Sequence, residues 1–85
     1  MDKNYTGNAI RHIRIKQGKS VEEIQDELNK MGFIRFVRNY TKIEKQEAKL
    51  YSHELPAICS ILGVSVEQLY ELANKLAPID KRVNL

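Results

Sequence analysis

Two short motifs that begin α-helices constrain the fold of this chain more than any other feature. Ser20 with Glu23, and Ser65 with Gln68, have the spacing of a capping box. In that motif the serine hydroxyl accepts a backbone hydrogen bond, and the side chain three residues later bonds back to the backbone of the serine. Each motif follows a glycine suited to ending a preceding helix, at Gly18 and Gly63. The sequence therefore predicts helices joined by short connections.

Composition and periodicity extend this to an all-α fold. Eighty-five residues are enough for one small domain, and the chain has only 4 Gly and 2 Pro. Apolar residues recur at helical spacing in five segments, at about residues 8–17, 21–31, 33–49, 52–62 and 66–76. For the third segment we expect at least its first part to be helical. We predict a five-helix domain over residues 1–77, with a C-terminal tail over residues 78–85.

Several classes of function are disfavoured by what the chain contains. A single cysteine excludes an internal disulfide and a cysteine-based zinc site, and the two histidines lack metal-ligand spacing, so we expect no metal and no cofactor. Cys59 falls on the apolar side of its helix, which predicts buried filler, and we expect no enzyme. No apolar run reaches 18 residues and no secretion signal is visible. We therefore expect a cytoplasmic protein with no membrane partner.

Basic residues form a stripe along the segment 33–49. Residues 1–20 carry a net charge of +4, residues 21–30 carry −3, and residues 31–50 carry +3. On a helical wheel the apolar residues of 33–49 lie on one side, and the basic ones lie on the other at spacings of three and four, namely Arg35, Arg38, Lys42, Lys45 and Lys49. Such a stripe is either a solvated face or a surface that binds nucleic acid.

Two charges stand on faces that are otherwise apolar. Arg14 interrupts the apolar side of the first predicted helix, and Glu44 that of the third. A lone charge on a core face is unfavourable, and two of opposite sign in different helices predict an ion pair. The alternative is that each side chain reaches the edge of the core separately.

These features together resemble the Cro/cI-type helix-turn-helix family, also called the Xre family, of small bacterial and phage repressors. That family pairs an arginine of its first helix with a glutamate that closes its recognition helix, as Arg14 and Glu44 would here. The resemblance covers about residues 8–74, and its closest stretches are 20–24 (Ser-Val-Glu-Glu-Ile), 40–44 (Tyr-Thr-Lys-Ile-Glu) and 61–69 (Ile-Leu-Gly-Val-Ser-Val-Glu-Gln-Leu). It implies a compact lambda-repressor-like fold, with a helix-turn-helix motif in the second and third helices.

The resemblance also implies a function. The protein would be a transcriptional regulator, expected to be a repressor, that reads the major groove of double-stranded DNA with the helix around residues 36–45. The base-contacting residues would be Arg38, Asn39, Thr41 and Lys42. The phosphate-contacting residues would be Lys16, Lys19, Arg35, Lys45 and Lys49. A homodimer on a palindromic operator is expected, in a bacterial or phage-derived protein that is nucleoid-associated when bound to DNA.

The chain departs from the family pattern at four places. Val21 replaces a glutamine that contacts phosphate, and Gln46 replaces a glycine after the closing glutamate. Phe36 and Val37 precede Arg38, where the recognition helix of the family usually begins with small polar residues. About five extra residues fall within 29–35, which predicts either a longer second helix or a lengthened turn; a lengthened turn is our expectation.

Other binding functions stay open. A helix-turn-helix fold also serves as a protein–protein adaptor or an antitoxin, and an exposed aromatic insertion (Phe33, Phe36 and Tyr40) would suit a protein partner. We expect instead that Phe33 and Phe36 cover the core. Single-stranded RNA is disfavoured, because the aromatic and basic residues lie on opposite sides of the helix.

Overall fold

The fold follows from six helical segments in chain order. The computed structural model describes residues 5–77. These contain α1 (Thr6–Lys16), α2 (Val21–Lys30), α3 (Ile34–Glu44), the short 3₁₀ helix η1 (Ser52–Glu54), α4 (Leu55–Leu62) and α5 (Val66–Leu76). The predicted all-α class with five α-helices is confirmed, and no strand occurs between residues 5 and 77. The predicted tail, residues 78–85, lies outside the described residues.

Both predicted capping boxes form. The Ser20 hydroxyl accepts a 3.1 Å hydrogen bond from the Glu23 amide, and the Glu23 carboxylate accepts a 2.7 Å bond from the Ser20 amide. Ser65 and Gln68 repeat the arrangement at 3.0 and 2.8 Å. These bonds satisfy backbone donors that the first turn of a helix leaves without intrahelical partners. The start points of α2 and α5 are thus encoded locally.

Four helices end with the same pair of backbone hydrogen bonds, known as the Schellman motif. At the end of α1 the Lys19 amide bonds to the Arg14 carbonyl, and the amide of Gly18 bonds to the Ile15 carbonyl. Equivalent pairs end α2 at Gly32, α3 at Gln46 and α4 at Gly63. The central residue of the motif needs a left-handed backbone, and glycine has the least cost there.

Gln46 is the non-glycine residue that takes this conformation, with φ of 65°. It replaces the glycine of the resembling family, and a left-handed backbone costs a side-chain-bearing residue about 1–2 kcal/mol. Its side chain offsets part of this cost, because Oε1 accepts a 2.7 Å hydrogen bond from the Asn8 amide in the first turn of α1. The end of α3 therefore caps the start of α1, whose N-cap residue Tyr5 makes no side-chain capping bond.

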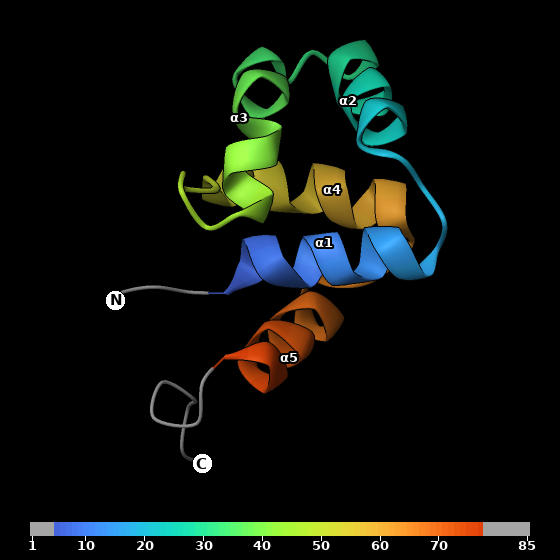
Figure 1. Cartoon of the computed structure of the whole chain (residues 1–85). Coiled ribbons are helices and arrows are strands. Elements are labelled where there is room, and N and C mark those ends of the chain that lie inside the picture. The colour runs from blue at the N-terminus through green and yellow to red at the C-terminus, as the bar shows by residue number, and fades with distance from the viewer. Residues whose placement is uncertain (1–4, 78–85) are drawn as a thin grey trace.

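Helix α1 lies at the centre of the molecule (Figure 1). It packs against α5 on one side and against α3 and α4 on the other, while α2 packs against α3 and α4. One apolar core joins the five helices, and its members exposed by 2% or less are Ala9, Ile10, Ile24, Leu28, Phe36, Tyr40, Ile43, Ile58, Leu62 and Leu69. The helices that carry the predicted motif, α2 and α3, thus share a single core with the rest of the domain.

The extra residues of the predicted motif lengthen α2 rather than the turn. Ile24 and Leu28 continue the buried stripe, so α2 runs to Lys30, and only residues 31–33 connect it to α3. The expected lengthened turn is therefore corrected. The core covering predicted for the aromatic residues is found, since Phe36 is buried and Phe33 packs partly buried against the core.

Cys59 is buried in α4 with 4% of its surface exposed, and this burial raises the pKa of its thiol. Because the thiolate is the reactive species, we expect Cys59 in the folded protein to react with a thiol reagent at neutral pH about 100-fold more slowly than in the unfolded chain. The matched control is Cys59→Ala/Ser60→Cys, which moves the thiol to an exposed neighbouring position. Equal labelling rates for the native protein and this control would contradict the assignment.

Candidate nucleic-acid interface

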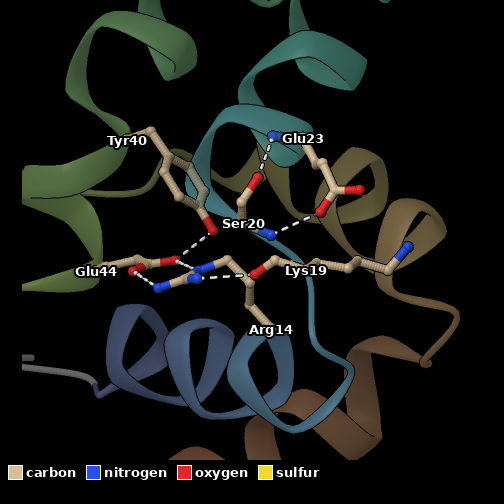
Figure 2. A network of polar contacts seen from close by, with 6 residues as sticks. All are labelled: Arg14, Lys19, Ser20, Glu23, Tyr40 and Glu44. Atoms are coloured by element: carbon tan, nitrogen blue, oxygen red, sulfur yellow. Dashed lines mark hydrogen bonds and ion pairs between the residues drawn. The ribbon is translucent and has the colours of Figure 1, made fainter.

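The C-terminal end of α3 is fixed to α1 by the predicted ion pair. Arg14 Nε lies 2.7 Å from Glu44 Oε2, and Nη2 lies 3.0 Å from Oε1, so the pair is bidentate (Figure 2). The remaining arm, Nη1, donates a 2.9 Å hydrogen bond to the Lys19 carbonyl just before α2. The two side chains are 12% and 5% exposed. One guanidinium therefore joins α1, the α1–α2 connection and α3.

Tyr40 completes this cluster from within α3. Its hydroxyl donates a short hydrogen bond to Glu44 Oε2 (Figure 2). Burial first, and then the neighbouring carboxylate, raise the pKa of Tyr40 far above its ordinary value. The hydrogen bonds that Arg14 donates to Glu44 likewise raise the pKa of Arg14. The Glu44 carboxylate thus has a cationic partner and a neutral donor, which is what a buried carboxylate requires.

The N-terminal end of α3 is fixed by a second arginine–carboxylate pair. Arg35 Nη1 lies 2.8 and 3.1 Å from the two oxygens of Glu54, whose side chain is 1% exposed. Arg35 Nη2 donates a 2.6 Å bond to the Lys49 carbonyl, and the guanidinium carbon lies 3.8 Å from the ring centroid of Tyr51. The sequence predicts a phosphate contact for Arg35. In the structure its guanidinium joins α3 to η1 and to the segment before it, and its side chain remains 33% exposed.

The surface of α3 between these two anchors is exposed and basic. Arg38, Thr41 and Lys42 are exposed, and Lys45 is exposed directly after the helix. The sole acidic residue of α3 is Glu44, which is buried in its ion pair. The positive charge on this face is therefore not neutralised from within α3, as a surface that binds phosphate requires.

Asn39 differs from its neighbours in the predicted base-contacting set. It is half-buried, and its Nδ2 donates a 2.9 Å hydrogen bond to the Arg35 carbonyl one turn earlier. Pairing with an adenine edge uses both the oxygen and the nitrogen of an asparagine amide. The amide nitrogen carries two N–H donors, so this backbone bond leaves one N–H and the oxygen of Asn39 for a base.

The predicted phosphate-contacting lysines lie at different places in the fold. Lys16 is exposed at the end of α1, and Lys19 is half-buried in the connection to α2. Helix α3 ends at Glu44, so Lys49 is exposed in the segment that follows and does not continue the helical stripe. Exposed acidic residues lie along α2 directly after Lys19, namely Glu22, Glu23, Asp26 and Glu27. Lys45 and Lys49 thus follow α3 closely, whereas Lys16 lies at the end of α1 and Lys19 is followed by acidic side chains.

Sequence reasoning missed the exposed apolar residues at the start of α3. Ile34 is 49% exposed and Met31 is 46% exposed. The helical wheel contained the signal for Ile34, because it precedes Arg38 by four residues and Thr41 by seven, and so belongs to the outward side. Val21, by contrast, packs partly buried against the core.

Two further properties of residues 5–77 bear on other functions. No group of three or more histidine, cysteine and acidic side chains is arranged to hold a metal ion within that range. None of its helices combines the length and the apolar character that crossing a membrane would require.

Comparison with known proteins adds no further information on the site. A scan against protein-family models, a search of curated proteins and a search of solved structures each gave no match to this chain.

Proposed function

We propose that this protein is a sequence-specific regulator of transcription, acting as a repressor that places α3 in the major groove of double-stranded DNA. The observation that carries the proposal is that α3 is anchored at both ends and exposes basic side chains between its anchors. Arginine–carboxylate pairs fix both of its ends, and the charged side chains exposed along it are basic. A rigid, basic, outward-facing helix can position base-reading side chains while its charge attracts the phosphate backbone.

The resemblance to Cro/cI-type repressors supports the same proposal. Helices α2 and α3 are joined by three residues, and the arginine and glutamate that the resemblance pairs lie 2.7 Å apart. In this docking mode the second helix of the motif enters the groove. Arg38 and Lys42 then reach base edges, while Lys45 and Lys49 contact phosphates as the chain leaves the groove. We place the protein in the cytoplasm and assign it no catalytic role.

We further propose that it acts as a homodimer on a palindromic site. One domain of this size offers few base contacts, and a dimer doubles them. Tyr70 is 49% exposed on α5, with Val66 and Leu76 partly buried on the same helix. A further apolar residue, Ile79, follows α5 in the sequence and lies outside the described residues. Helix α5 lies on the side of α1 away from α3, so pairing through it leaves both copies of α3 accessible (Figure 1).

The test compares alanine variants for binding to a selected DNA site and to scrambled DNA at several salt concentrations. Arg38→Ala is expected to lose about 1–3 kcal/mol on the selected site and to relax preference at one base position. Lys49→Ala is expected to weaken both DNAs alike and to lower the salt slope by about one unit. Arg11→Ala, at an exposed arginine of α1 outside the proposed contacts, is the matched control and is expected to match the wild type.

Two outcomes would overturn the proposal in different ways. If the wild type binds neither DNA at low salt, the regulator function is wrong, and the exposed Met31 and Ile34 then favour a protein partner, as for an adaptor or an antitoxin. If Arg38→Ala and Lys49→Ala behave identically on both DNAs, the protein binds DNA without reading its sequence.

A further inference from the structure

We propose that Ile34 is a specificity-determining residue that reads the C5 methyl group of a thymine in the major groove. This inference rests on the proposed function and adds to it a named base feature. Its starting point is that Ile34 is 49% exposed in the first turn of α3, the helix proposed to enter the groove. The predicted set of base contacts is entirely polar and omits it.

Ile34 lies on the same side of α3 as the proposed base-reading residues Arg38 and Thr41. Ile34, Arg38 and Thr41 are spaced by four and three residues, and all three are exposed, so they form one outward row along α3. In helix-turn-helix docking the N-terminal residues of the recognition helix contact base edges. Ile34 is the first residue of α3 and therefore lies at the end that enters deepest.

The side chains next to Ile34 in α3 and at its N-cap are held by the domain, whereas Ile34 is exposed. Phe33 packs against the core with its ring 6.3 Å from that of His53, and Arg35 is bound to Glu54. Phe36 is fully buried. The residues on both sides of Ile34 thus turn into the domain, and the isoleucine remains as the apolar group on an otherwise polar row.

An apolar side chain among basic ones suits a particular feature of DNA. The thymine C5 methyl is the apolar group that base pairs present in the major groove, and apolar side chains contact it there. A protein partner would have to be acidic to match Arg38, Lys42 and Lys45, whereas duplex DNA supplies the negative charge and the methyl group together. DNA is therefore the occupant to which we assign this row.

The helix geometry also predicts how many base pairs separate this thymine from the base that Arg38 reads. Four residues of α-helix separate Ile34 from Arg38, which is about 6 Å along the axis. Successive base pairs lie about 3.4 Å apart along each strand. The thymine read by Ile34 is therefore expected about two base pairs from the base read by Arg38, in each half of the palindrome.

The experiment replaces thymines of the selected site, one position at a time and in both half-sites, with deoxyuridine, which lacks only the methyl group. At one position we expect wild-type affinity to fall about 4-fold per half-site, the effect of removing one buried methyl group. Ile34→Ala is expected to bind the thymine site more weakly and to have lost the preference for thymine over deoxyuridine. Its salt slope is expected to equal that of the wild type, because no charge changes.

Ile15→Ala is the matched control, since Ile15 is 51% exposed but lies on α1. It is expected to keep the wild-type preference for thymine. The inference is overturned, with the proposed function intact, if the wild type binds its site but discriminates at no position. Retention of the full preference by Ile34→Ala overturns it equally. Failure of the wild type to bind any DNA overturns the proposed function itself.

Discussion

Replacing Arg14 by methionine is expected to lower the free energy of unfolding by about 3–5 kcal/mol. The guanidinium makes two hydrogen bonds to Glu44 and one to the Lys19 carbonyl, and the variant removes all three. Glu44 would remain 5% exposed without its cationic partner, and an unpaired buried charge is strongly unfavourable. Urea unfolding followed by circular dichroism measures the change.

A double-mutant cycle with Glu44→Gln isolates the pair itself. The double variant is expected to lose at least about 1 kcal/mol less than the two single variants together, because neither charge is then left unpaired. Arg11→Met is the matched control, an exposed arginine on the same helix, and should change stability by no more than about 0.5 kcal/mol. Strict additivity of the two single variants would contradict the ion-pair assignment.

The sequence was sufficient for those parts of the fold that rest on local signals. Capping boxes at Ser20 and Ser65 depend on residues three apart, and they form as predicted. The pairing of Arg14 with Glu44 is a long-range contact, but each charge interrupts an apolar face, which indicated that a partner was needed. The cost of burying a lone charge thus favoured pairing over the alternative in which each side chain reaches the edge of the core separately.

The partner of Arg35 could not be predicted in the same way. Arg35 fits the spacing of the basic stripe, and helical periodicity gives the side from which a side chain leaves but not its rotamer. Its acceptors, Glu54 and the Lys49 carbonyl, and the ring of Tyr51 come from η1 and the non-helical segment before it. The path of that segment depends on how the whole domain packs. One residue of the predicted phosphate-contacting set is therefore used to position α3.

Gln46 shows a related limit at the other end of α3. The sequence shows that Gln46 stands where the resembling family has a glycine. It does not show that the backbone at this position keeps the left-handed conformation. The side chain reaches α1 because Gly7, in the first turn of that helix, has no Cβ to obstruct the approach. The departure from the family pattern is thus accommodated by a contact between two helices that are distant in sequence.

Gly7→Ala is expected to lower the free energy of unfolding by about 2–3 kcal/mol, although alanine is normally the better helix former by about 1 kcal/mol. A Cβ added at Gly7 would lie 1.8 Å from the carbonyl oxygen of Ile43 and 2.8 Å from its carbonyl carbon. Both atoms belong to the backbone of α3, so no rotamer change can relieve the overlap. The two helices would have to separate, weakening the Asn8–Gln46 hydrogen bond and displacing the last turn of α3.

Gly18→Ala separates this steric effect from the general cost of replacing a glycine. A Cβ at Gly18 meets nothing within 4 Å, but the backbone there has φ of +72°, so that variant is expected to lose only about 1 kcal/mol. Urea unfolding measures both variants, and equal slopes would show that their denatured states are comparable. If Gly7→Ala is as stable as the wild type, α1 and α3 do not pack through backbone contact. Under the proposed function, Gly7→Ala should also weaken binding to the selected DNA site more than Gly18→Ala does, because it displaces the recognition helix.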